Sequence, residues 1–201
     1  MKKSLILGIT LLAMMSCHHN QNPLLSNEET PYGVPAFDKI RLEHYMPAFK
    51  EAIKQQNEEI DAIVNNPEDP TFENTIVPLE FSGSILRKVS GVLYNITETD
   101  RTEALDSVME LAIPLTTEHS DNMSFNKALY ERIATLYKGD QSKLTREQQM
   151  VLKKHFEDFE RSGIGLSEEK QARLREINTE MAGKIQKIGN NILAESNAFE
   201  M

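Results

Sequence analysis

The sequence predicts an all-α fold, a helical bundle of about six helices. Apolar residues recur at steps of three, four and seven along six segments, which is the spacing of one face of a helix. The connections between these segments are short and polar, and no stretch alternates apolar and polar residues as a half-buried strand does. Because 201 residues are enough for one domain with its own core, these patterns favour helices packed on helices.

The first two predicted helices are separated by a proline. The first covers 44–64 and ends before Pro67, because the residue that precedes a proline avoids the α region. The second covers about 70–95. Pro78 falls inside it, and since proline cannot donate to the carbonyl four residues earlier, we expect a kink there.

Capping signals mark where the middle helices begin. Asp100 and Glu103 have the spacing of a capping box and open a predicted helix over about 101–117. Pro114 is expected to bend the end of this helix. A fourth helix is predicted over roughly 124–138.

The last two predicted helices also carry capping signals. Thr145 and Gln148 form a second capping box, and the helix after it ends at Gly163. The sixth helix begins after Ser167 and is the longest, with about 28 residues and a length of roughly 42 Å. Its apolar face consists of Leu174, Ile177, Met181, Ile185, Ile188 and Ile192.

The first thirty residues have the features of an export signal and a tether. Two lysines precede an apolar run over 5–15, which is shorter than the about 20 residues that cross a bilayer. Ser16 and Cys17, the only cysteine, follow. We therefore predict that 1–16 is a lipoprotein-type signal peptide and that Cys17 carries the lipid. An ordinary secretory signal with an incidental thiol remains the alternative, and 17–30 is predicted to be a tether.

The charge of the chain excludes one class of function. The formal net charge is −9, whereas binding to nucleic acid needs a basic face. The same charge opposes adsorption to anionic lipid, so the lipid on Cys17 would have to supply any membrane attachment. These features predict an exported, membrane-anchored lipoprotein that faces the periplasm of a bacterium.

A series of motifs between Phe37 and Leu193 carries a family resemblance. The most specific is Phe72-Glu73-Asn74-Thr75. Other matching blocks are Pro35–Ile40 with His44, His119–Asp121, Leu129–Ile133, Phe159–Gly163 and Leu174 with Ile177–Asn178. Their order and spacing resemble the N-terminal region of the thimet oligopeptidase family of zinc metallopeptidases, which includes oligopeptidase A and the Dcp-like bacterial peptidyl-dipeptidases.

The resemblance implies a function for a longer protein. In this family two histidines of an H-E-x-x-H motif and a downstream glutamate hold one Zn²⁺, and the glutamate of the motif is the general base. The N-terminal helices, here 31–201, form one wall of a channel that admits short peptides. H-E-x-x-H does not occur in this sequence. We therefore expect a domain truncated before its catalytic partner domain and inactive alone, with zinc only in the complete enzyme.

No catalytic residue and no metal ligand are assigned within the chain. The histidines of the body, His44, His119 and His155, are never four residues apart, and we predict capping or packing roles for them. Glu73 and Asn74 lie in the first turn of a predicted helix, where an acid faces the positive end of the dipole. The four motif residues, Phe72 to Thr75, are therefore predicted to be structural.

Two other functions remain open, and they differ in whether the chain is an enzyme. The chain could be a stand-alone helical lipoprotein that binds peptides or other proteins. It could also be catalytic through a site with no familiar motif. A stand-alone module should unfold cooperatively as a monomer, whereas a fragment should expose apolar surface that its missing partner would cover.

Overall fold

The computed structural model describes residues 22–26 and 30–199, and within these ranges every regular element is helical. The elements in chain order are η1 (Pro31–Gly33), α1 (Leu42–Val64), η2 (Phe72–Ile76), α2 (Val77–Phe81), α3 (Ser84–Thr99), α4 (Glu103–Ser124), α5 (Lys127–Lys138), α6 (Arg146–Arg161) and α7 (Glu168–Ala198). The all-α prediction is confirmed. The predicted signal peptide and Cys17 lie outside the described residues. In the described ranges, no helix has the length and hydropathy of a membrane span.

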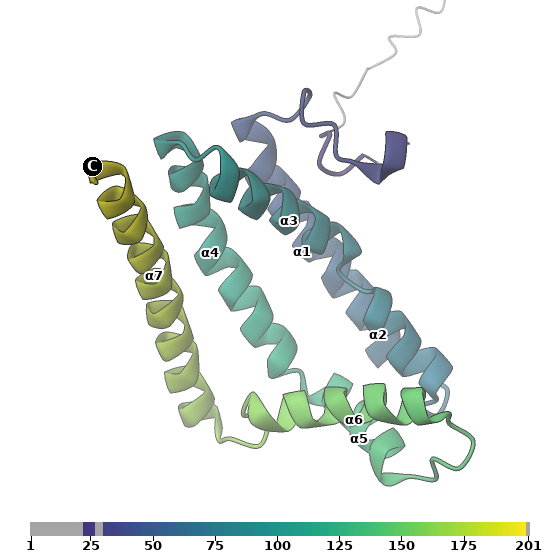
Figure 1. Ribbon diagram of the computed structural model, residues 1–201. Coiled ribbons are helices and arrows are strands. Elements are labelled where there is room, and N and C mark those ends of the chain that lie inside the picture. Colours follow the sequence, from purple (N-terminus) through teal and green to yellow (C-terminus); the bar gives the residue numbers. More distant parts are fainter. Residues whose placement is uncertain (1–21, 27–29, 200–201) are drawn as a thin grey trace, which may run out of the picture.

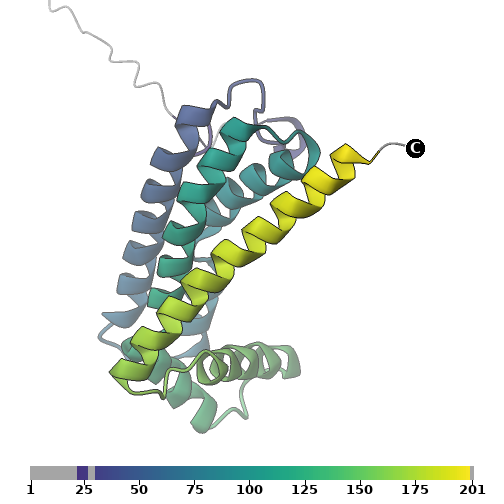
Figure 2. The ribbon, with the colours of Figure 1, turned by 90° about the vertical axis from the view of Figure 1, so that its left-hand side faces the viewer.

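The helices are arranged around α4. Helices α1 and α3 lie side by side and both contact one side of α4, while α7 lies along its other side (Figure 1). Helices α5 and α6 pair with each other and contact η2, across one end of the molecule (Figure 1). When the molecule is turned, α7 is seen to cross α4 at an angle, so that its C-terminal end diverges from α4 (Figure 2).

Two apolar clusters form the core of the described residues. The first joins α1, α3 and α4, and its most buried members are Leu24, Ala48, Phe49, Val89 and Leu93. The second lies between the end of α1, η2, α5 and α6, and consists of Ile60, Ile63, Phe72, Ile76, Leu129, Ile133 and Leu152. No described residue of α7 belongs to either cluster.

The helix predicted over 70–95 is divided into η2, α2 and α3. Phe72–Ile76 forms a π-helical turn that continues directly into α2, because Ile76 and Val77 are both in the right-handed helical region. Pro78 therefore lies inside a continuous helical stretch, directly after a π-helical turn, which is one of the recognised sources of a kink.

The real break lies at Gly83, between α2 and α3. Its φ is 66°, in the left-handed region that favours glycine. A Cβ added to this residue would lie only 2.5 Å from side-chain atoms of Gln56 on α1. The backbone N–H of Gly83 donates to a carboxylate oxygen of Glu59, also on α1, at 2.7 Å. Glycine at this position thus allows the corner between α2 and α3 to pack directly on α1.

The boundaries of the middle helices also differ from prediction. Helix α4 continues past residue 117 to Ser124, with Pro114 inside it. Its N-cap is Thr102 and not Asp100. Helix α5 begins at Lys127, three residues after the predicted position. The second capping box, at the start of α6, is confirmed.

The tether predicted over 17–30 is wrong for residues 22–26. Leu24 is fully buried in the first apolar cluster. The side-chain amide of Asn22 donates to the carbonyl oxygen of His44 on α1 at 2.7 Å. The folded body therefore includes 22–26, ahead of the boundary predicted at residue 31.

Helix α7 is the longest helix of the described residues. Its 31 residues make a rod of roughly 46 Å. The apolar face identified in the sequence is largely exposed, and only Leu174 is half-buried. The exposed fractions are 42% for Ile177, 52% for Met181, 61% for Ile185, 58% for Ile188 and 62% for Ile192. We call these five residues the α7 stripe.

Candidate functional site

The family motif forms the turn that leads into η2. The Thr71 hydroxyl accepts a hydrogen bond from the backbone N–H of Asn74 at 3.0 Å, and the Asn74 side-chain oxygen accepts one from the N–H of Thr71 at 2.8 Å. This reciprocal capping box satisfies two backbone donors at the start of the element. Phe72 packs in the second apolar cluster and Thr75 is fully buried, whereas Glu73 is exposed.

Arg132 on α5 holds this turn against the end of α1. Its Nη1 donates to the carbonyl oxygens of Asn66 at 3.0 Å and Glu68 at 3.3 Å. Its Nη2 donates to the side-chain oxygen of Asn74 at 3.2 Å, and its Nε lies 3.4 Å from the Thr75 hydroxyl. The planar guanidinium thus joins two stretches of chain through one fork of donors. We call this arrangement the Arg132 clamp.

Sequence reasoning missed Arg132 as a functional partner of the motif. A signal was present, because Arg132 lies between two apolar residues, Leu129 and Ile133, that are both fully buried. A long cation at that place on an amphipathic helix needs acceptors nearby. The motif and Arg132 together bring α1, η2 and α5 into one arrangement.

Two of the histidines are engaged at the α1 surface. His44 Nδ1 accepts a hydrogen bond from the backbone N–H of Arg41 at 3.0 Å and so caps α1, which is a role of the predicted kind. His119 on α4 is 5% exposed, and its Nε2 lies 2.8 Å from the side-chain oxygen of Gln56 on α1. Burial lowers the pKa of His119 below its ordinary value of 6.5.

His155 makes a different connection, between α6 and α2. Its Nε2 lies 2.5 Å from a carboxylate oxygen of Glu80. Within the described ranges, His, Cys, Asp and Glu side chains do not gather in a group of three or more that could hold a metal ion. The three histidines therefore contact three different parts of the fold.

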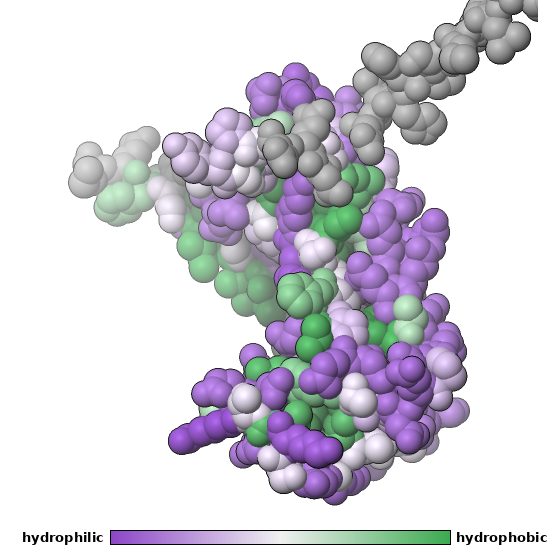
Figure 3. Space-filling view, turned by 90° about the vertical axis from the view of Figure 1, so that its right-hand side faces the viewer, coloured by the Kyte–Doolittle hydropathy of each residue, from purple (hydrophilic) through white to green (hydrophobic). Residues whose placement is uncertain are grey.

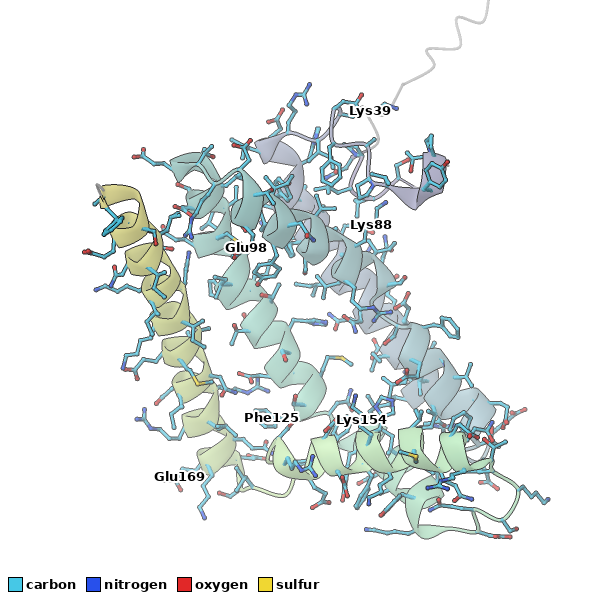
Figure 4. The ribbon with its side chains drawn as sticks, in the orientation of Figure 1. Lys39, Lys88, Glu98, Phe125, Lys154 and Glu169 are labelled. Carbon is cyan, nitrogen blue, oxygen red and sulfur yellow. The ribbon has the colours of Figure 1, made fainter. Side chains whose placement is uncertain are left out.

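A groove of about 410 Å³ lies between α3, α4 and α7. Its lining includes Tyr94, Glu98, Arg101, Ile113, Ile185 and Gln186, of which Glu98 is labelled in Figure 4. The Arg101 Nε donates to the Asp106 carboxylate at 2.6 Å, and another of its nitrogens bonds Asn190 on α7. The Gln186 Nε2 atom is buried and has no hydrogen-bond partner among the described residues.

Polar contacts also hold the other end of α7 to α4. The Asn178 amide donates to the Asp121 carboxylate at 2.6 Å. The Arg175 guanidinium donates to the Asn122 side chain at 2.9 Å and lies 4.8 Å from the centre of the Phe125 ring. Phe125, labelled in Figure 4, is the residue at which α4 ends. Hydrogen bonds and one cation–π contact therefore join this end of α7 to the end of α4.

Comparison with known proteins identifies the class of this domain. Residues 49–171 match the family model of the neurolysin/thimet oligopeptidase N-terminal domain. The chain therefore belongs to this family of peptidases and represents its helical N-terminal domain. The family resemblance seen in the motifs is confirmed.

Particular relatives extend the match to most of the chain. It is 35% identical over 178 residues to dipeptidyl carboxypeptidase of Salmonella typhimurium, covering 88% of this chain and 26% of that protein. It is 32% identical over 174 residues to dipeptidyl carboxypeptidase of Escherichia coli, covering 86% and 26%. It is 31% identical over 173 residues to oligopeptidase A of Escherichia coli, covering 86% and 25%. The chain thus spans about a quarter of the length of these relatives.

Proposed function

We propose that this chain is the N-terminal helical domain of an exported, lipid-anchored zinc metallopeptidase of the peptidyl-dipeptidase type. Alone it has no hydrolytic activity, and in the complete enzyme it forms one wall of a channel for short peptides. The observation that carries this proposal is the match itself, which covers 88% of the chain but only 26% of its relative. Two dipeptidyl carboxypeptidases at 35% and 32% identity support the peptidyl-dipeptidase branch.

The side chains described above do not fit a zinc site. His44 caps a helix, His119 contacts Gln56 and His155 contacts Glu80, so the three imidazoles are separated and engaged elsewhere. H-E-x-x-H does not occur in the 201 residues. We therefore assign no hydrolytic step to this chain, and the zinc belongs to residues of the complete enzyme outside it.

The shape of the domain supports a role as a wall. Its surface is hollowed between α7 and the end formed by α5 and α6, and apolar residues gather on the side of α7 that faces this hollow (Figure 3). A stand-alone module would be expected to cover such a face within its own fold. The exposed α7 stripe therefore favours the proposal over the alternative of an independent peptide-binding lipoprotein.

A direct test is to assay the purified chain for zinc and for hydrolysis of short peptides, with and without a chelator. The dipeptidyl carboxypeptidase of Salmonella typhimurium, assayed in parallel, serves as the positive control. We expect no bound zinc and no turnover from the isolated chain. Stoichiometric zinc or chelator-sensitive turnover would contradict the proposal.

The anchor is tested separately by Cys17→Ser. If Cys17 carries the lipid, the wild-type chain should fractionate with bacterial membranes and the variant should appear in the soluble fraction, because a lipid chain supplies the binding energy for the membrane. Ser16→Ala, which keeps a small residue before the cysteine, is the matched control and should stay with the membranes. Equal fractionation of the wild type and Cys17→Ser would exclude the anchor.

A further inference from the structure

The α7 stripe has the geometry of a docking face. From Leu174 to Ile192 the apolar positions advance 18 residues in five steps, which is the 3.6-residue repeat of a straight helix. The stripe therefore does not drift around α7. From Ile177 to Ile192 it presents a straight apolar surface of about four turns, or roughly 22 Å.

Most of this surface lies outside the contact with α4, although Ile185 also lines the groove between α7 and α4. The side of α7 that faces α4 carries Asn178, Ala182 and Gln186, and the larger apolar residues stay largely exposed. Soluble helices ordinarily bury their apolar side and expose their polar side. Helix α7 instead turns polar residues toward α4 and exposes its large apolar residues. This indicates that something other than α4 covers the stripe.

The groove beside the α7 stripe belongs to the same surface. Ile185 belongs to the stripe and also lines the groove, so the two surfaces are continuous. The lining of the groove also includes Ile113 of α4 and Tyr94 of α3, so the apolar surface continues from the stripe onto the neighbouring helices. A matching occupant thus needs an apolar helix face.

We propose that the stripe and groove are the docking face for the remainder of the longer protein, and that a helix of that remainder lies along α7. The relatives supply the argument for this occupant, because about three quarters of their length lies outside the matched region. The inference rests on the proposed function and adds to it the surface through which the domain joins its partner. A second copy of this chain is the competing occupant. Two copies that each carry a formal net charge of −9 repel one another, which disfavours that occupant.

The test uses a chimera in which this chain replaces the matched region of the Salmonella typhimurium dipeptidyl carboxypeptidase. The test variant is the double substitution Ile185→Glu with Ile188→Glu. The control is Leu111→Glu on α4, because Leu111 is 60% exposed, as these isoleucines are, but does not line the groove. Peptidase activity, the thermal midpoint and hydrogen exchange of α7 are measured in the chimera, and the thermal midpoint and mass in solution are measured in the isolated chain.

We expect the double variant to lower the activity of the chimera on the order of tenfold or more, since it places charges in an apolar interface. The same variant should leave the thermal midpoint of the isolated chain unchanged, because the two side chains are exposed there. Leu111→Glu should leave both proteins unchanged. Amide exchange in α7 should be slower in the chimera than in the isolated chain.

The outcomes separate the inference from the proposed function. An active chimera that tolerates both glutamates overturns the inference and leaves the proposed function intact. A chimera that is inactive with the wild-type stripe overturns the proposed function and the inference with it. An isolated chain that is a dimer, and that the double variant converts to a monomer, identifies a second copy as the occupant and also overturns the inference.

Discussion

Helices α1 and α7 are both long, both amphipathic and both packed on α4, but they turn opposite faces toward it. Helix α1 buries Phe49, Ala52 and their neighbours in the first apolar cluster. Helix α7 meets α4 through polar partners such as Asn178 and exposes its isoleucines. A periodic apolar face in a sequence therefore identifies a surface to be covered, while the segment that covers it can lie outside the domain.

The two interfaces differ in energy for the same reason. Burying a large apolar side chain contributes about 1.5–3 kcal/mol, and α1 buries several of them in the clusters. A hydrogen bond between protein groups contributes about 0.5–1.5 kcal/mol, because it replaces a bond to water. We expect α1 to hold the domain together and α7 to contribute little to its stability.

The largest expected effect compares one substitution in each helix. Phe49→Ala should lower the free energy of unfolding by about 3–5 kcal/mol, since Phe49 is fully buried on α1. Ile188→Ala should change it by less than about 0.5 kcal/mol, since that side chain is exposed on α7. Chemical denaturation of both variants provides the measurement. Equal losses would show that α7 is as well packed as α1 and would remove the contrast.

The Arg132 clamp provides the next test, on the α1 side of the molecule. Arg132→Lys should cost about 1.5–3 kcal/mol, because an ammonium group cannot reproduce the fork of donors to Asn66, Glu68 and Asn74. Arg161→Lys on α6 is the matched control, because its side chain is exposed. If the two lysine variants are equally stable in denaturant, the clamp does not stabilise the fold.

Replacing either of two glycines by alanine should change the stability of the domain, in opposite directions at the two positions. Gly83→Ala should destabilise the domain by about 1–2 kcal/mol, because alanine is strained at its φ of 66° and its Cβ would lie against Gln56 of α1. Gly183→Ala on α7 should stabilise the domain by about 0.5–1 kcal/mol, since a Cβ there meets nothing within 4 Å and alanine favours a helix. Thermal unfolding of both variants distinguishes a tight contact from an open surface. The same sign for both would contradict this description.

The smallest effect concerns pH at the contact between α1 and α4. Burial lowers the pKa of His119 below 6.5, so the unfolded chain binds more protons than the folded chain between the lowered pKa and 6.5. The stability from a neutral buried His119 is complete above about pH 6.5 and is lost as the pH falls through the lowered pKa. His119→Gln should therefore unfold with a flatter pH dependence than the wild type between about pH 7.5 and pH 5. Parallel profiles for the two proteins would refute this linkage.

Much of the fold follows from the sequence because local signals and packing agree. The spacing of apolar residues in α1 predicts both its extent and its buried face, and Thr145 with Gln148 predicts the start of α6. The signals are less clear for breaks within a predicted helix. Proline and glycine can both interrupt a helix, and only the folded chain shows that the break between α2 and α3 lies at Gly83 and not at Pro78.

The candidate site was less predictable, because its contacts join segments that are distant in sequence. The motif from Phe72 to Thr75 indicated a capped turn, but its partner Arg132 lies on α5 and reaches it only in the folded chain. For α7 the periodicity located the apolar face but not whether that face is covered. Periodicity reports which residues of a helix are apolar, and the neighbour that would cover them is not encoded in that helix.

The polar contact between α4 and α7 has a consequence for turnover of the protein in the cell. A helix held mainly by hydrogen bonds opens at a lower free energy than one that belongs to a core. Helix α7 will then be the first long segment offered to housekeeping proteases, and its loss would leave both apolar clusters intact. The half-life of the protein should therefore report whether α7 is covered, in a cell extract and without any measurement of catalysis.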